Sequence, residues 1–265
     1  MTIIDTHAHL DHIENLAEAL SNAAGAGVEA IVTVSVNADS CRKNLEIKKS
    51  VMHPKIHLAM GMHPSDADSA KVGECVELIQ AHKNALAAVG EIGLDFWYKW
   101  VRKDQEKKDA QRHVFRTLLE TAGETGLPAI VHTRGTWREC LDMVKGVGLT
   151  KAEFHWYSGP IDVLRDILNS GYYISAAPSL AYSPQSRAAI SYAPVDRTMI
   201  ETDSPVFYHG LSVGDGQEER GGFTAEPKDV VQTLKAYCAL KNLDEESTLE
   251  ILNRNAREFF HLADR

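Results

Sequence analysis

The feature that most constrains this chain is a series of apolar runs of strand length, separated by segments of helical periodicity. The intervening residues 13–27, 71–83 and 108–126 repeat apolar side chains three and four apart and end near Gly, Asn or Pro. Strands that alternate with helices in this way form parallel βαβ units. The eight expected strands are TIID (2–5), VEAIVTVSV (28–36), KIHLAMGM (55–62), LAAVGEIGL (86–94), LPAIVHT (127–133), AEFHWY (152–157), GYYISAA (171–177) and RTMIET (197–202).

Eight such units in a chain of 265 residues predict an α/β fold, the (β/α)8 or TIM barrel. The sequence has no low-complexity linker, so we expect residues 1–265 to form one barrel domain, closed by C-terminal helices from about residue 226. Residues 205–227 are long and Gly-rich for a connection in such a fold. A functional loop beside the active rim and a surface insertion are both compatible with this segment.

Composition narrows the class of protein. The chain is 44% apolar, has no run of membrane-spanning length and lacks a basic-then-apolar signal pattern at its N-terminus. Its four cysteines (Cys41, Cys75, Cys140 and Cys238) are scattered without a CxxC pair, which predicts a reduced cytoplasmic protein. The net charge of −9 argues against a broad nucleic-acid-coating surface, but not against a narrow site where bound cations supply positive charge. No membrane and no obligate protein partner are expected.

Metal-competent side chains recur at the ends of the expected strands. In IIDTHAHLDH (3–12), side chains two apart on an extended strand share a face, so His7 and His9 could converge on one cation. The C-terminal ends of barrel strands carry the active site in folds of this kind. The other candidates at or near such ends are Glu91, His132, His155 and Asp203.

Imidazole and carboxylate groups bind divalent ions such as Zn²⁺, Mn²⁺, Fe²⁺ and Mg²⁺. A carboxylate can bridge two ions about 3.5–4 Å apart, and Glu91 is placed to do so, while Asp203 could bind an ion and accept a proton from its water. The remaining ligands would be His7 and His9 for one ion, and His132 and His155 for the other.

Each residue alone has an ordinary alternative. A single His at a strand end is often structural, and Asp203 could cap a turn. Glu91 inside an apolar run is costly unless it is paired or bound to metal. Six such residues on one rim predict a metal site.

The residues at this point resemble a known family, the TatD-type metal-dependent hydrolases and deoxyribonucleases of the amidohydrolase superfamily. The resemblance runs from residue 3 to about residue 260. The motifs that carry it are DTHAHLD (5–11), GMHP (61–64), VGEIGLDF (89–96), Gln111 with Phe115 and Leu118 before LPAIVHTR (127–134), FHWYSG (154–159), ETDSP (201–205) and NAREFF (255–260).

The resemblance implies a TIM barrel of the metallo-dependent hydrolase type, with one or two divalent ions and phosphodiester hydrolysis of DNA, often from the 3′ end. It implies that Glu91 bridges the ions and that Asp203 is both a ligand and the general base. The glutamate, where many superfamily members use a carboxylated lysine, favours the TatD branch. The sequence departs from the family at HWYSG (155–159) and in the long segment after ETDSP, both of which lie where substrate would bind.

Four neighbours receive candidate roles. By family analogy, His63 could meet a phosphate oxygen. Arg134 could make a bidentate phosphate contact or an ion pair that holds the rim together. Asp5 could orient a ligand histidine or make a structural hydrogen bond, and Glu201 could support a ligand or add polarity to the core.

The segment FWYKWVRK (96–103) interleaves three aromatic rings after Phe96 with Lys99, Arg102 and Lys103. Rings beside basic groups are a common way to hold unpaired bases. The alternative, which we favour from sequence, is that Trp97 and Trp100 pack under the loop while the charges face water.

We therefore expect a metal-dependent deoxyribonuclease that uses metal-activated water, with single-stranded DNA or strand ends as substrate. A hydrolase of a small amide, lactone or phosphoester on the same barrel is the alternative. A non-catalytic binding barrel is disfavoured because all six metal-type residues are present.

Overall fold

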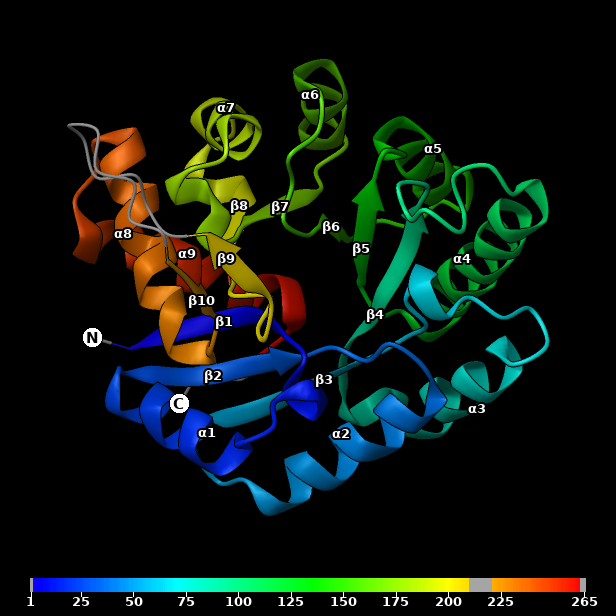
Figure 1. The fold of residues 1–265 in the computed structure, drawn as a ribbon, viewed down its shortest axis with the longest axis horizontal. Helices are drawn as coiled ribbons and strands as arrows, with labels where there is room; N and C mark the ends of the chain where they lie inside the picture. The colour runs from blue at the N-terminus through cyan, green and yellow to red at the C-terminus, as the bar shows by residue number, and fades with distance from the viewer. Residues whose placement is uncertain (1, 210–220, 263–265) are drawn as a thin grey trace.

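The computed structural model describes residues 2–209 and 221–262, and its strands form one eight-stranded parallel sheet in the order β1 to β8. A bridge between Ala8 and Ser204 joins the first strand to the segment after the last, so the sheet is nearly closed. Figure 1 shows the strands inside and the helices outside, which confirms the predicted barrel. The strands are β1 (Ile3–Ala8), β2 (Val28–Thr33), β3 (Lys55–Met60), β4 (Leu86–Asp95), β5 (Ala129–Arg134), β6 (Ala152–Phe154), β7 (Tyr173–Ala176) and β8 (Thr198–Ile200).

All eight predicted strands are present, with shifted ends. β1 continues to Ala8 and so includes His7. β6 stops at Phe154, before the predicted end at residue 157, and Trp156 has a φ of 42°, outside the β region. β8 begins at Thr198, after a 3₁₀ turn at residues 195–197, and ends at Ile200, two residues before the predicted end.

The helices cover the outside of the barrel (Figure 1) and include those predicted at 13–27, 71–83, 108–126 and after residue 226. No helix in the described ranges is both long and apolar enough to cross a membrane. The helices are α1 (Leu16–Gly25), α2 (Ala38–Ser50), α3 (Val72–His82), α4 (Gln105–Thr125), α5 (Trp137–Gly146), α6 (Ile161–Asn169), α7 (Pro184–Tyr192), α8 (Val230–Lys241) and α9 (Glu245–Phe260).

The C-terminal helix α9 packs against the barrel interior. Phe259 and Phe260 share a buried cluster with Ile4 and Met199, which lie on β1 and β8. The Asn253 side chain accepts a hydrogen bond from the Ile4 backbone N–H at 3.1 Å and donates one to the Thr2 carbonyl at 2.8 Å. Helix α9 thus packs beside the beginning of β1, while the ligand-type residues lie toward the C-terminal ends of the strands.

The long connection after β8 is partly ordered into a hairpin. β9 (Phe207–His209) and β10 (Gly222–Thr224) pair antiparallel, while residues 210–220 of the predicted loop 205–227 lie outside the described residues. Tyr208 is fully buried and its hydroxyl donates to the Thr202 carbonyl at 2.9 Å. The described base of the segment is therefore packed on the barrel rim rather than loosely inserted.

Candidate metal centre

A cavity of about 670 Å³ opens at the C-terminal ends of the strands. Five of the six predicted metal-type residues line it, and His7 lies fully buried against them. The predicted substrate contacts, His63 and Arg134, are also in its wall. The residues from the metal-type set are His9, Glu91, His132, His155 and Asp203.

Glu91 lies at the centre of this group, and one of its oxygens faces the first two histidines. Its Oε2 atom is 3.3 Å from His7 Nε2 and 3.4 Å from His9 Nε2. Asp203 Oδ1 lies 3.5 and 3.2 Å from the same two nitrogens. A tetrahedral shell at about 2.0–2.1 Å from an ion places neighbouring ligand atoms about 3.3–3.4 Å apart. The observed spacing is that of a divalent-ion site.

The other oxygen of Glu91 faces the second pair of histidines. Oε1 is 2.7 Å from His132 Nδ1 and 2.7 Å from His155 Nε2, and these two nitrogens are 3.2 Å apart. One carboxylate therefore presents a separate oxygen to each pair, which is the arrangement that a bridging ligand needs.

The atoms between these residues lack hydrogen-bond partners. His7 Nε2, Glu91 Oε2 and Asp203 Oδ1 are all buried and unsatisfied by any described residue. Buried polar atoms in native proteins are almost always paired, so three orphans that face one another require a missing partner. A divalent cation satisfies all three at once, and the residues present fit one.

The charges of these groups are strongly coupled. Burial alone would raise the pKa of Glu91, but His155 and its neighbouring imidazoles hold it well below its usual range. Burial likewise opposes the shift at Asp203, whose pKa is lowered by contact with His9. Burial would lower the pKa of His9, yet Asp203 and Glu91 raise it to about 10. Without an ion, the Glu91 and Asp203 carboxylates are therefore ionised, and the pKa values of His9, His132 and His155 beside them are raised.

Two further carboxylates lie behind the imidazoles. Glu201, fully buried, has Oε1 3.4 Å from His155 Nδ1 and Oε2 3.9 Å from His7 Nδ1, so both rings turn Nε2 toward Glu91. Asp95 Oδ2 lies 3.2 Å from His132 Nε2, which turns Nδ1 of that ring toward Glu91. Carboxylates in these positions fix the tautomer and orientation of metal-binding histidines.

Asp95 is a site residue that was not predicted from the sequence. It lies four residues after Glu91 on the same strand, in the motif VGEIGLDF. Side chains at even spacing share a strand face, so this periodicity is the signal that could have found it. Because the expected strand ends at residue 94, Asp95 looks in the sequence like an ordinary loop residue.

Asp5 acts on the backbone rather than on a histidine ring. Its Oδ1 accepts hydrogen bonds from the backbone N–H of His7 at 3.3 Å and of Thr202 at 3.0 Å, and its Oδ2 accepts one from the Thr202 hydroxyl at 2.6 Å. Of the two interpretations from sequence, the structural hydrogen bond is the one observed. Asp5 holds the His7 strand against the segment that leads to Asp203.

Close backbone approach beside Glu91 depends on glycine. Gly93 has a φ of 156°, and a Cβ there would lie 1.9 Å from the His132 carbonyl oxygen. A Cβ on Gly61 would lie 2.7 Å from the Glu91 carbonyl oxygen. These two positions let β3, β4 and β5 come together where Glu91 and His132 meet.

His63 is buried beside the second histidine pair. Its Nδ1 accepts the Ser65 backbone N–H at 3.1 Å, and Nε2 lies 3.4 Å from His132 Nδ1. Burial, with further contributions from nearby imidazoles, lowers the pKa of His63 to about 3, so the ring is neutral. The Ser65 hydroxyl oxygen also lies 2.7 Å from Nδ1, so the tautomer of the neutral ring is set by whether Nδ1 pairs with the backbone N–H or with this oxygen.

Arg134 forms the ion pair that was one of its two interpretations. Its Nε lies 2.8 Å from Asp95 Oδ2, and its guanidinium stands 5.0 Å from the centre of the Tyr98 ring. The side chain is 45% exposed in the cavity wall, so the pair leaves it accessible.

The aromatic segment differs from the favoured expectation. Trp97 is 58% and Trp100 52% exposed, whereas Val101 is the residue that packs beneath the loop, at 2%. The prediction that both tryptophans pack under the loop is wrong for these two rings. Tyr98 between them lines the cavity.

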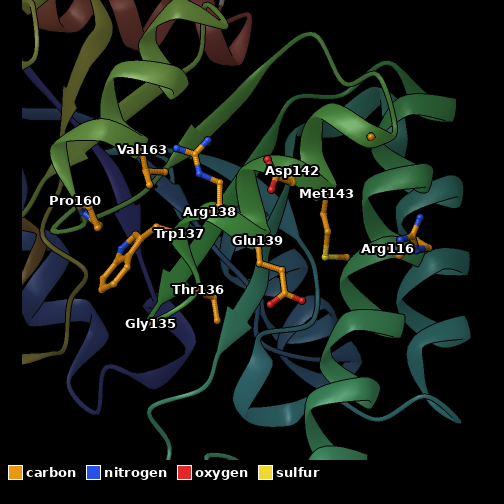
Figure 2. A pocket seen from close by; sticks show the side chains of 11 residues that line it. Arg116, Gly135, Thr136, Trp137, Arg138, Glu139, Asp142, Met143, Pro160 and Val163 are labelled. Carbon is orange, nitrogen blue, oxygen red and sulfur yellow. The ribbon is translucent and has the colours of Figure 1, made fainter.

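A second cavity, of about 630 Å³, is lined by residues of α4, α5 and α6. Figure 2 shows Trp137 and Pro160 at one end of it and Arg116 at the other. Arg138 in its wall is paired with Asp166 at 2.8 Å, and no histidine lines it within the described ranges. Glu139 and Asp142 contribute carboxylates to its lining, but this cavity lacks the combined imidazole and carboxylate set of the first.

Comparisons with known proteins identify the family of this chain. The family model of TatD related DNases matches residues 4–261. The deoxyribonuclease TATDN3 of Homo sapiens is 26% identical over 97% of this chain and 94% of its own length. An uncharacterized metal-dependent hydrolase of Methanocaldococcus jannaschii is 28% identical over 97% of this chain and 96% of its own.

Solved structures share the fold. The TatD homologue YjjV of Escherichia coli has a TM-score of 0.84 at 22% identity, covering 98% of each chain. A TatD family hydrolase of Entamoeba histolytica has a TM-score of 0.82 at 21% identity, again covering 98% of each chain. With the family model matched along almost the whole sequence, this chain belongs to the TatD related DNase family of metal-dependent hydrolases.

Proposed function

We propose that this protein is a metal-dependent deoxyribonuclease that removes nucleotides from strand ends with two divalent ions bridged by Glu91. The observation that carries the proposal is that the two oxygens of Glu91 face different histidine pairs. His7, His9 and Asp203 would complete the first ion's ligand set, and His132 and His155 the second. The nitrogen and oxygen donors suit Zn²⁺, Mn²⁺ or Fe²⁺, with Mg²⁺ also possible at the carboxylates.

Bound divalent ions lower the pKa of water and neutralise charge on a phosphate. Among the protein's own groups, Asp203 is the proposed general base. It lines the cavity beside His7 and His9, where its carboxylate would lie within reach of a proton on the attacking water. Glu91 is proposed to act with Asp203 by holding the two ions in position.

Two residues of the cavity wall are proposed to bind the phosphate. His63 lies in the cavity wall, where its ring would donate to a phosphate oxygen when Nε2 carries the proton. Its Nε2 is also 3.6 Å from Glu91 Oε1, so that His63, Glu91 and His132 could together hold an ion. Arg134, oriented by Asp95, presents a guanidinium at the same wall. Glu201 and Asp95 are proposed to support the histidines, and Asp5 to hold the backbone that carries His7.

We further propose that the chain acts as one barrel domain in a reducing, cytoplasmic compartment and within the amidohydrolase superfamily. The packing of α9 on β1 supports a single barrel domain. The four cysteines are buried and free, which is compatible with a reducing compartment. No obligate partner protein enters this proposal.

Hydrolysis of a single-stranded DNA oligonucleotide labelled at its 3′ or 5′ end tests the proposed function. Metal-reconstituted protein should shorten it stepwise, and the Asp203→Asn variant should lose about 10²- to 10⁴-fold in rate, the range for loss of a general base. Thermal unfolding would check that the variant is folded.

An intact oligonucleotide, with metal bound, would contradict the deoxyribonuclease proposal. Turnover of a chromogenic small ester or lactone in the same preparation would then assign the centre to the small-molecule alternative.

A further inference from the structure

The loop between β4 and α4 is held in a fixed shape at the rim of the cavity. The aromatic loop, residues 96–103, turns back on itself because the N–H groups of Val101 and Arg102 both donate to the Tyr98 carbonyl at 2.9 Å. The backbone N–H of Trp97 donates to Asp95 Oδ1 at 2.9 Å. The loop is thus anchored to the residue that orients His132.

Two rings of this loop form a stack that leads out of the cavity. The rings of Tyr98 and Trp100 are 4.4 Å apart at an interplanar angle of 19°. Tyr98 lines the cavity and carries the Arg134 guanidinium 5.0 Å from its centre, whereas Trp100 is half exposed. A continuous series of flat groups therefore runs from the cavity wall to the surface.

Trp97 has a different environment. Its ring meets Trp137 edge-on at 5.8 Å, and a Cβ on Gly135 would lie 2.4 Å from its Nε1. Trp97 therefore packs against the start of α5, although 58% of the residue stays exposed. Among the residues that the structure describes, Trp100 stacks on Tyr98 and leaves about half of its surface to solvent.

The charge of the loop is opposite to that of the whole chain. Lys99, Arg102 and Lys103 are exposed, and no acidic residue lies between Trp97 and Lys103, in a protein of net charge −9. A local basic group beside exposed rings complements a polyanion that has unpaired bases. An acidic protein surface would satisfy the charges but would leave the stacked rings without a flat partner.

We propose that the aromatic loop is a binding site for single-stranded nucleic acid, in which an unpaired base stacks on Trp100 while Lys99, Arg102 and Lys103 contact the phosphates. The inference rests on the proposed function, because Tyr98 and Arg134 connect this site to the cavity where the strand end would react. A base inside a duplex is already stacked on both faces, so the site selects single strands or frayed ends. It adds affinity for the strand without taking part in the chemistry.

The test compares two substrates in the metal-loaded enzyme. For a single-stranded oligonucleotide of about 12 nucleotides, within the span of one binding groove, Trp100→Ala should raise KM by about 5- to 150-fold, the equivalent of one lost base stack. Bis(p-nitrophenyl) phosphate has no strand to hold, so the rise in its KM should be at least about fivefold smaller. Trp100→Phe should recover part of the oligonucleotide affinity, because phenylalanine keeps a flat ring.

Tyr192→Ala is the matched control, since Tyr192 is 48% exposed at the far end of α7 and should leave both KM values unchanged. An oligonucleotide KM that Trp100→Ala leaves within twofold of wild type would overturn the inference. An equal rise in KM for both substrates would also overturn the inference, because Trp100 would then act on the metal centre itself.

Direct binding separates this inference from the proposed function. If the wild type hydrolyses neither substrate, fluorescence anisotropy of a labelled oligonucleotide still decides the matter. Binding that Trp100→Ala weakens and Tyr192→Ala does not would support a strand-binding site on a protein with another activity. No binding by the wild type, or equal binding by both variants, would overturn it.

Discussion

Asp95 Oδ2 lies 3.2 Å from Nε2 of His132, whose Nδ1 lies 2.7 Å from Glu91. The histidine is therefore held between a carboxylate that orients it and one that shares its proposed ion. Asp95 also pairs with Arg134, so this buried carboxylate links the metal centre to the cavity wall.

Replacing Asp95 by Asn should weaken metal binding without removing a ligand. The amide keeps the shape but loses the charge that fixes the His132 tautomer, so we expect a loss of about 10- to 100-fold in affinity for one of two ions. Isothermal titration with Zn²⁺ or Mn²⁺ would measure this. Asp39→Asn, at an exposed position on α2, is the control and should bind as the wild type does. Equal affinity of the Asp95 variant and the wild type would show that Asp95 does not orient His132.

Gly93→Ala should destabilise the barrel at the centre itself. A Cβ there would lie 1.9 Å from the His132 carbonyl, so β4 and β5 must separate, at a cost of about 1–3 kcal/mol or more. Gly123→Ala is the contrast, because this helical glycine has nothing within 4 Å of its added Cβ and should gain about 0.5–1 kcal/mol. Urea unfolding of both variants measures the difference. Equal stability of the two would contradict the observed close approach.

Metal affinity should rise with pH. The pKa of His9, raised to about 10 in the metal-free protein, means that its ring is protonated at pH 7 and must lose this proton to bind an ion. Glu91 and Asp203, whose pKa values are lowered, are already ionised and release none. At pH values below 10, each proton released on binding should therefore raise the apparent metal affinity about tenfold for every unit by which the pH increases. Titrations from pH 6 to 9, in buffers of different ionisation enthalpy, would show the slope, and a flat profile would contradict it.

His9 should also make the stability of the metal-free protein fall as pH rises. Its folded-state pKa lies above the unfolded value of about 6.5, so its contribution to stability is complete below that pH and is lost as pH rises through about 10. The melting temperature of chelator-treated protein should thus fall as the pH becomes alkaline, and His9→Gln should make this fall less steep. An unchanged decline in His9→Gln would assign it to other groups.

Much of the fold and of the centre was predictable because both rest on short-range periodicity. Alternating strand and helix patterns predict the barrel, and His7, Glu91 and Asp203 are conspicuous as polar residues at the ends of apolar runs. The six metal-type residues could be predicted to meet because strands of a parallel barrel end on one rim.

What could not be predicted depends on backbone conformation and packing between distant residues. Trp156 has a φ of 42°, so the chain leaves the extended conformation inside the expected strand 152–157. Asp203, with a φ of 48°, turns the chain directly after the expected strand 197–202. The exposure of Trp100 depends on Val101 filling the space beneath the loop. The choice between the two roles of Asp5 depends on where Thr202 lies.

The measurement that tests the central claim most directly is the number of divalent ions held by the wild type and by Glu91→Gln, after equilibrium dialysis and elemental analysis. A bridging Glu91 predicts two ions per wild-type chain and fewer than one in the variant, with the fold retained by circular dichroism. Two ions in Glu91→Gln, or fewer than two in the wild type at saturating metal, would contradict the account.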